Sequence, residues 1–492
     1  MLEDIPRTGL WKRFLLGAVL CIFAAAGATA VAAFHEVDKV VKALELGPEL
    51  ELRKGTLAET DSGKPQTLLI LGSDRRPKDN VEGAANDARS DTIMLVRLNP
   101  DKEATAIMSL PRDLKVEIPG VGVDKINAAY SYGGPQKTLD TVKKLTGLPI
   151  NHMVNVTFKG FWRAVNAIGC VYTDIDHDYY NDSAEFQYIN VDPGYQRLCS
   201  RKALQYVRYR HTDTDLVRSA RQQDFLRQAK QQITTSKLIE ESGRLMKIFG
   251  RNTSTDPGLR SRSEVLRLLK LALVSARQPI QEIHFEGTIG PSYVEASDAQ
   301  VKRLVQQFLD VQDTEGPRGQ AREKRVKSRQ PKRKRRRHQT DAAALGLYDA
   351  SSIGEEQALQ AVQAGAGGSL PVLYPSLLLN SSEFVPPPRV YKIRGTDGKK
   401  YGAYRMVLRK YNADGEYYGM QGTTWMDPPI LDDPTGTRKL GGREYELHFA
   451  GDRLRLVAWH TPKAAYWISN TLLQTLSEKQ MLAIARSTRR CC

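Results

Sequence analysis

The chain has 492 residues, of which 41% are hydrophobic and 26% are charged. This composition excludes a wholly disordered chain, and the length predicts two or three folded domains. The net charge of +16 is typical of a nucleic-acid-binding protein, but residues 318–338 alone hold twelve lysines or arginines and one glutamate. Because this stretch carries most of the surplus, we expect no nucleic acid as a partner of the folded domains.

An uncharged, apolar segment occupies residues 14–34, near the amino terminus. Its 21 positions are enough for a helix to cross a bilayer. Basic residues precede it and acidic residues follow it, so the positive-inside rule places residues 1–13 in the cytoplasm and the rest of the chain outside. We therefore expect a single-pass cell-membrane protein with a transmembrane anchor and, at residues 35–64, a polar, partly helical stalk. A cleaved signal peptide and a buried core helix are the alternatives.

Two of the five cysteines, Cys170 and Cys199, fall in a region that we expect to be folded. Cys21 lies inside the apolar segment, and Cys491 and Cys492 end the chain. In an exported protein a matched pair predicts a disulfide, which would close a loop of about 30 residues and stabilise the fold by about 3–4 kcal/mol. Metal binding by two cysteines without a nearby histidine is the less favoured alternative.

Residues 65–312 alternate strand-like and helical patterns. Short, mostly apolar runs predict strands, and longer stretches with apolar residues three or four positions apart predict helices. The alternation is typical of an α/β domain with a mixed central sheet flanked by helices. The expected strands are residues 67–74, 91–99, 103–110, 152–158 and 170–175, and the expected helices include residues 135–148, 158–169, 263–276 and 298–312.

The patterns in the remaining residues predict a linker and a second, smaller unit. Residues 313–368 combine the basic run with small residues, which predicts a disordered linker. On an exported chain its charge would contact anionic wall polymer or lipid headgroups. Residues 369–485 show two pairs of strand-like runs around short turns and then a helical pattern, so we expect an α+β module of unknown role before a tail at residues 486–492. His460 in this module is more readily a sheet residue than a ligand.

Charged residues gather where strands of the first domain begin or end. Ligands of open α/β sheets bind beyond strand ends, and the planar fork of arginine suits phosphate. Two aspartates in such positions suit Mg²⁺, which prefers one or two carboxylates together with waters and phosphate oxygens. The pattern therefore predicts a pyrophosphate site, with surface ion pairs and a solvated helix face as the alternative interpretation. The residues concerned are Asp74, Arg89, Asp91, Arg112, Asp113, Arg208, Arg210, Arg218 and Arg221.

Six motifs follow one another between about residues 65 and 235: LLILGSDRR, ARSDTIMLV, MSLPRDLKVEIPG, DKINAAYSYGGP, FKGFWRAVNAIGCV and ALQYVRYRHTDTDLVRSARQQDFL. Together they resemble the LytR-CpsA-Psr family, exported enzymes that attach glycopolymers to bacterial cell walls. The resemblance implies an α/β catalytic domain with a hydrophobic tunnel for a polyprenyl tail. Phe161, Trp162, Val165 and Ile168 would line that tunnel, or would be core residues in a fold without one.

The resemblance also implies roles for the charged residues. Asp74 and Asp91 would bind the cofactor Mg²⁺, and either Asp91 or Asp113 would accept the proton of the attacking hydroxyl. Arg112 and Arg210 would join these two aspartates as the catalytic residues. The pyrophosphate would be held by Arg89, Arg112, Arg208, Arg210, Arg218, Arg221 and Gln222.

The implied activity is that of a Mg²⁺-dependent phosphotransferase. It would move a glycopolymer from a polyprenyl-pyrophosphate carrier to a peptidoglycan hydroxyl, forming a phosphodiester link outside the membrane. The expected partners are thus the lipid-linked glycan, the peptidoglycan acceptor and the membrane itself. A polyprenyl-pyrophosphate hydrolase and a non-catalytic binder or regulator that senses wall precursors are the alternatives.

Overall fold

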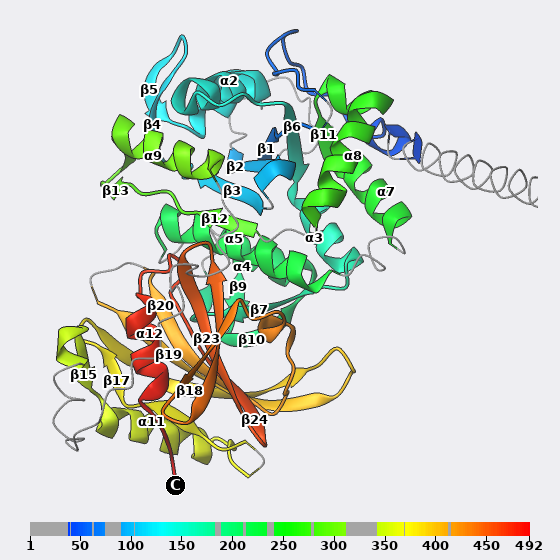
Figure 1. Ribbon diagram of the computed structural model, residues 1–492. Helices are drawn as coiled ribbons and strands as arrows, with labels where there is room; N and C mark the ends of the chain where they lie inside the picture. Colours follow the sequence, from blue (N-terminus) through cyan, green and yellow to red (C-terminus); the bar gives the residue numbers. More distant parts are fainter. Residues whose placement is uncertain are drawn as a thin grey trace, which may run out of the picture.

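The computed structural model describes most of the chain (Figure 1). The described residues are 38–39, 41–61, 63–73, 90–102, 104–182, 188–209, 213–233, 241–276, 280–310, 342–368, 370–411 and 415–492. Among them no helix is both long enough and apolar enough to cross a membrane. The expected anchor at residues 14–34 and the cytoplasmic residues 1–13 lie outside the described residues, as does the basic run at residues 318–338.

Six strands of the described chain form a mixed sheet in the first unit (Figure 1). β1 and β3 each lie antiparallel to β2, whereas β6 is parallel to β1 and β12 is parallel to β3. The carboxyl ends of four strands therefore meet at one edge of the sheet, and the expected mixed α/β fold is confirmed. The order across the sheet is β11 (Thr253–Thr255), β6 (His152–Thr157), β1 (Gln66–Ser73), β2 (Ser90–Asn99), β3 (Ala104–Leu110) and β12 (Ile280–Ile283).

The apolar runs of the sequence form the core of this sheet. Leu69 and Leu71 of β1 and Leu95 of β2 are fully buried in one cluster with residues of α2 (Ala128–Thr146) and α9 (Asp298–Leu309). Alternate residues of a strand point to one face, so these two helices cover that face of the sheet. The other elements of this unit are β4 (Lys115–Ile118), β5 (Gly122–Lys125), α3 (Phe158–Ala167), β7 (Val171–Ile175), β8 (Tyr179–Asn181), β9 (Ile189–Val191), β10 (Gly194–Leu198), α4 (Ser200–Arg208), α5 (Asp215–Gln232), α7 (Ser242–Asn252), α8 (Arg262–Ala276), β13 (Thr288–Ile289) and β14 (Val294–Glu295).

The expectation of a separate stalk at residues 35–64 is wrong for its described part. Leu50 is buried, and its backbone N–H donates to the carbonyl of Thr255 in β11 at 2.9 Å. Further along, the backbone N–H of Ala58 donates to the carbonyl of Ile150 at 2.8 Å. Apolar residues within this mainly polar stretch bury against the domain, so the stretch follows the surface of the α/β unit.

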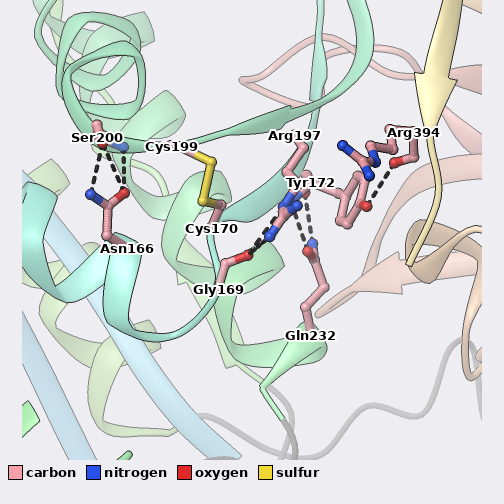
Figure 2. The surroundings of a disulfide bond; sticks show 9 residues. All are labelled: Asn166, Gly169, Cys170, Tyr172, Arg197, Cys199, Ser200, Gln232 and Arg394. Atoms are coloured by element: carbon pink, nitrogen blue, oxygen red, sulfur yellow. Dashed lines mark hydrogen bonds between the residues drawn. A yellow bond between two sulfur atoms is a disulfide. The ribbon is translucent and has the colours of Figure 1, made fainter. Parts of the chain in front are cut away.

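Figure 2 shows the disulfide between Cys170 and Cys199, with an Sγ–Sγ distance of 2.04 Å. It joins the end of the α3 region to the residue before α4, next to the antiparallel pair β7–β10. Beside it, the side chain of Asn166 accepts hydrogen bonds from the backbone N–H and the hydroxyl of Ser200, at 2.8 and 3.0 Å. These contacts fix the start of α4, the helix that carries Arg208 at its far end.

The second unit is built on an antiparallel sheet of seven strands among the described residues (Figure 1). Two of its hairpins, β18–β19 and β22–β23, occur where the paired strand-like runs of the sequence predict them. The order is β18 (Ser382–Arg394), β19 (Lys400–Lys410), β20 (Tyr417–Thr423), β24 (Ala464–Ser469), β23 (Arg453–Thr461), β22 (Arg443–Ala450) and β21 (Gly436–Leu440); β15 (Leu347–Asp349), α11 (Ser351–Gln363), β16 (Leu373–Pro375), β17 (Leu377–Leu379), α12 (Glu478–Arg486) and β25 (Thr488–Arg490) pack around it.

Two expectations for this unit are wrong. The predicted disordered linker at residues 313–368 is folded from residue 342 onward, because α11 buries Ala358 and Ala361 against the sheet. The helical pattern expected from about residue 466 begins instead with the strand β24, whose Trp467 and Ile468 are fully buried. Only the later part of that pattern forms the helix α12.

The two units share a buried interface. Arg405 of β19 is fully buried, and its Nη1 donates to Oδ1 of Asp174 in β7 at 3.1 Å. The same carboxylate accepts a hydrogen bond from the indole nitrogen of Trp467 at 3.1 Å. Tyr172 and Tyr195 of the first unit lie in one apolar cluster with Trp425 and other residues of the second. The carboxyl-terminal unit therefore packs as part of the same folded body.

Candidate functional site

Several of the residues predicted from the sequence to form a site lie at the carboxyl edge of the central sheet. Ser73 ends β1, Thr157 ends β6 and Leu110 ends β3, and these strands run parallel, so their following residues emerge at one edge. Arg112 and Asp113 come directly after β3. Open α/β sheets bind ligands at such an edge, so charged residues that gather here are in a position to contact a ligand.

Arg112 and Arg218 converge on one carboxylate there. The backbone N–H of Arg112 donates to Oδ2 of Asp215 at 2.6 Å, and its Nε lies 3.8 Å from Oδ1 of the same residue. Arg218, one turn further along α5, forms an ion pair with this carboxylate. Both arginines are nearly buried, at 8% and 3% exposed. Counted with Lys125, the two arginines exceed the carboxylates of Asp215 and Asp113 by one positive charge, which an anionic ligand would complement.

Asp113 lies on the other side of Arg112. Its Oδ2 is 3.5 Å from Nε of Arg112, and its Oδ1 is 3.0 Å from Nζ of Lys125. Burial acts to raise the pKa of the Asp113 carboxyl, but the positive charges of Arg112, Lys125 and Arg218 outweigh it and hold that pKa below its ordinary value. Asp113 is therefore ionised at neutral pH and helps to orient Arg112.

We expect Asp113→Asn to change how the free energy of unfolding depends on pH. Because the pKa is lowered in the folded state, the charged contacts stabilise the fold fully above the ordinary value of 3.8 and are lost as the pH falls through the folded value. The free energy of unfolding of the wild type should then fall more steeply below about pH 4 than that of the variant. Urea unfolding of both proteins at several pH values between 3 and 7 measures this difference, and identical slopes would contradict it.

Gln222 and Arg208 lie at a second part of this edge. Oε1 of Gln222 accepts a hydrogen bond from the hydroxyl of Thr92 in β2 at 3.4 Å, and its Nε2 donates to the carbonyl of Val207 at 3.1 Å. The guanidinium of Arg208 lies 4.0 Å from the ring centre of Phe158, the residue that follows β6. These contacts bring the end of α4 to the amino end of β2, next to Asp91.

Asp91 occupies an irregular position in the sheet. Gly72 pairs with Thr92 but Ser73 pairs with Ser90, so the backbone of Asp91 forms a bulge between them. Bulges are frequent next to functional sites, where they redirect a side chain. Asp74 follows Ser73 in the sequence but lies outside the described residues, so Mg²⁺ binding by Asp74 and Asp91 stays a prediction from their donor chemistry. Among the described residues no group of three or more His, Cys, Asp or Glu could hold a metal.

Three predicted site residues, Asp74, Arg89 and Arg210, lie outside the described residues, and nothing tests their roles. Arg221 is described, and the structure does not favour its predicted contact with pyrophosphate. It is fully buried, forms an ion pair with Asp213, and its Nη1 donates to the carbonyls of Tyr206 and Tyr209 at 2.9 and 3.1 Å. Its guanidinium thus binds groups of the protein itself.

The residues proposed as tunnel walls lie around one core cluster. Val165 is buried, whereas Phe161, Trp162 and Ile168 are partly buried and pack against the same cluster between α3, α4 and α5. Trp162 also lines a cavity of about 490 Å³ between α3 and α7 whose border includes Arg163, Lys247 and Arg251. That border is basic rather than apolar, so the hydrophobic tunnel stays a prediction.

Sequence reasoning missed two residues of the site, Asp215 and Lys125. Asp215 stands in the arginine-rich motif, where its position as the first residue of α5 is not evident before the helix start is known. Lys125 belongs to the motif DKINAA, whose residues show no chemical pattern of their own. The hairpin β4–β5 brings Lys125 back to Asp113.

Comparison with known proteins identifies similar chains. A model of the LytR_cpsA_psr family matches residues 28–311. An uncharacterized protein of Staphylococcus aureus is 32% identical over 215 residues, which are 43% of this chain and 52% of that protein. The polyisoprenyl-teichoic acid–peptidoglycan teichoic acid transferase TagU of Oceanobacillus iheyensis is 32% identical over 251 residues, 48% of this chain and 73% of that protein. The chain thus spans about half the length of the first relative and about three quarters of the second.

Among solved structures, TagT bound to LI-WTA has 23% sequence identity and a TM-score of 0.42, over 54% of this chain and 99% of that one.

Proposed function

Because the chain belongs to the LytR-CpsA-Psr family, we propose that it is a membrane-anchored phosphotransferase that attaches a glycopolymer to peptidoglycan. The donor would be a glycopolymer linked to a polyprenyl pyrophosphate, and the acceptor a peptidoglycan hydroxyl. The observation that carries the proposal is the convergence of Arg112 and Arg218 on Asp215 at the carboxyl edge of the sheet. The name of the TagU relative, a polyisoprenyl-teichoic acid–peptidoglycan teichoic acid transferase, supports the same reaction class.

In the proposed reaction the acceptor oxygen attacks the phosphorus that carries the sugar. A new P–O bond forms, the bridging P–O bond of the pyrophosphate breaks, and the lipid monophosphate leaves with the electron pair. Such transfer depends mainly on positioning and on neutralising charge on the phosphate oxygens. Arg112 and Arg218 would do both, and Arg208, at the end of α4, and Arg210, two positions later in the sequence, would add further positive charge.

The hydroxyl proton needs an acceptor near the site. Asp113 is ionised and Asp91 is the other candidate, so one of the two carboxylates would take this proton. Since the pKa of Asp113 is lowered, it is a weak base, which a loose transition state tolerates. Asp74 and Asp91 would hold Mg²⁺, which when bound neutralises charge on the two phosphates.

We place the reaction on the outer side of the cell membrane. The segment at residues 14–34 would anchor the chain, and the basic residues before it would stay in the cytoplasm. The disulfide between Cys170 and Cys199 supports export, because such bonds persist in oxidising compartments.

The test is to supply the full-length chain in detergent with a lipid-linked glycopolymer and to follow release of polyprenyl monophosphate with and without peptidoglycan. We expect release only when peptidoglycan is present, together with glycopolymer bound covalently to it. Equal release without peptidoglycan would identify a hydrolase. Binding of the donor without any release would identify a binder or regulator.

A further inference from the structure

A cavity of about 760 Å³ lies between the two units of the protein. One wall consists of β12 and the residues after it, together with α9. The opposite wall comes from the carboxyl-terminal unit, at the β22–β23 turn and at residues 473–475. Cavities that bind small ligands have volumes of about 300–1,000 Å³ and often lie between domains, so this one has the size and place of a binding site.

The cavity adjoins the arginine site. Leu216 lines it and directly follows Asp215, the carboxylate that both Arg112 and Arg218 contact. In addition, β12 is the parallel neighbour of β3, so its carboxyl end opens at the same sheet edge from which Arg112 emerges. The backbone N–H of Val294, in β14, donates to the carbonyl of Asp113 at 2.9 Å, and β14 pairs with β13 at the cavity wall.

The lining of the cavity differs from the arginine site in charge. Its side chains include Gln281, Gln300, Gln306, Gln307 and Gln474, which can donate and accept hydrogen bonds without carrying charge. Its acidic residues Glu286, Asp310 and Asp452 outnumber the single arginine, Arg453, while Glu282 is paired with Arg227 at 2.8 Å. A phosphate-rich polymer would be repelled here, whereas an uncharged ligand with many hydroxyl and amide groups would find partners.

His284 adds a neutral polar group to this lining. Burial, followed by the charge of Arg453, lowers the pKa of its imidazole to about 4, so the ring is uncharged at neutral pH. Neither ring nitrogen has a hydrogen-bond partner among the described residues, and the nearest carboxylate oxygen, Oε2 of Glu282, is 3.7 Å from Nε2. Both nitrogens are themselves buried, so the imidazole contributes an uncharged surface to the cavity wall.

We propose that this cavity binds the glycan part of the acceptor, as an uncharged N-acetylhexosamine oligosaccharide. The inference rests on the proposed function, because it assigns the donor to the basic arginine site and the acceptor to the neutral-to-acidic cavity beside that site. The anionic donor would bind at the arginines, and the acceptor sugar would bind between the two units with a hydroxyl directed toward the arginine site. The carboxyl-terminal unit would then contribute to acceptor recognition.

The test compares three full-length proteins: the wild type, the double variant Gln306→Ala/Gln307→Ala, and the control Gln363→Ala. Gln306 and Gln307 are exposed side chains of α9, and alanine is a strong helix former, so the fold should be retained. Gln363 is an exposed residue at the end of α11 and does not line this cavity. Tetra-N-acetylchitotetraose, an uncharged N-acetylhexosamine tetrasaccharide, and inorganic pyrophosphate are titrated into each protein by calorimetry.

We expect the tetrasaccharide to bind the wild type and the control equally and to bind the double variant about tenfold more weakly, since two hydrogen-bonding side chains are lost. Pyrophosphate should bind all three proteins alike. Equal saccharide affinity in all three, or no saccharide binding to the wild type, would overturn the proposal. If pyrophosphate fails to bind while the saccharide result is as expected, the cavity assignment stands and the proposed function fails.

Discussion

Arg112→Ala is expected to lower kcat of transfer by about 10²- to 10³-fold, as removal of one preorganised donor to a developing negative charge does in other enzymes. The guanidinium of Arg112 lies within 4 Å of two carboxylates at the sheet edge where the phosphates would bind. The hydrogen bond that holds Asp215 comes from the backbone N–H of Arg112, so alanine retains it. The measurement is single-turnover transfer with saturating donor.

Two control variants and the melting temperature show whether an effect of Arg112→Ala comes from the lost charge, the lost planar geometry or a loss of folding. Arg112→Lys keeps the charge but loses the planar fork, so its kcat should lie between those of the alanine variant and the wild type. Arg409→Ala removes an exposed arginine of the carboxyl-terminal unit and should leave kcat unchanged. Wild-type kcat for Arg112→Ala, with an unchanged melting temperature, would exclude Arg112 from the reaction.

Arg221→Met is expected to lower the free energy of unfolding by about 3–5 kcal/mol, the usual effect of removing one partner of a buried ion pair. Asp213, whose side chain is fully buried, would lose its counter-charge, and the carbonyls of Tyr206 and Tyr209 would lose a donor. The affinity for pyrophosphate of the folded variant should stay close to that of the wild type. Urea unfolding and pyrophosphate titration provide the two readouts.

A second variant makes the Arg221 prediction specific. Replacing both members of a buried ion pair by uncharged residues often restores stability, so Arg221→Met with Asp213→Leu should recover much of the loss. Wild-type stability together with a large loss of pyrophosphate affinity in Arg221→Met would contradict the structural role. That result would support the role expected from the sequence, in which Arg221 binds the ligand.

The strands of the first unit could be predicted because their sequence signal is local. Within the expected strand at residues 67–74, residues 68–71 are all apolar and charged residues follow from Asp74, and β1 is found at Gln66–Ser73. The expected strand at residues 103–110 is mostly apolar after Glu103 and is followed by Arg112 and Asp113, and β3 is found at Ala104–Leu110. Charged residues directly after parallel strands share one sheet edge, so the position of Arg112 and Asp113 followed from topology, whereas Asp215 and Arg218 reach them from α5.

Arg221 shows what the sequence leaves undetermined in the site. Arg218 and Gln222 are four residues apart and share a face of α5, whereas Arg221 lies about 100° around the helix from Gln222. Only the tertiary structure tells which of these faces meets the protein interior. Asp213, which neutralises Arg221, precedes the helix in a motif with several charges, and no spacing rule pairs the two.

The prediction of a disordered linker was wrong for a different physical reason. Small residues such as glycine and alanine are typical of disordered segments, but they also allow close packing. A Cβ atom at Gly354 of α11 would lie 2.7 Å from the ring of Tyr374, so glycine permits this helix to approach β16. Composition alone cannot distinguish these two uses of small residues.

The most direct test of the pyrophosphate site is a calorimetric titration of the full-length chain with a short-chain polyprenyl pyrophosphate. It would be performed with and without Mg²⁺, for the wild type and for Asp91→Asn. We predict that the wild type binds the ligand, that Mg²⁺ tightens this binding, and that Asp91→Asn abolishes the effect of Mg²⁺. No binding by the wild type under either condition would contradict the account, and the arginines at the sheet edge would then need another ligand.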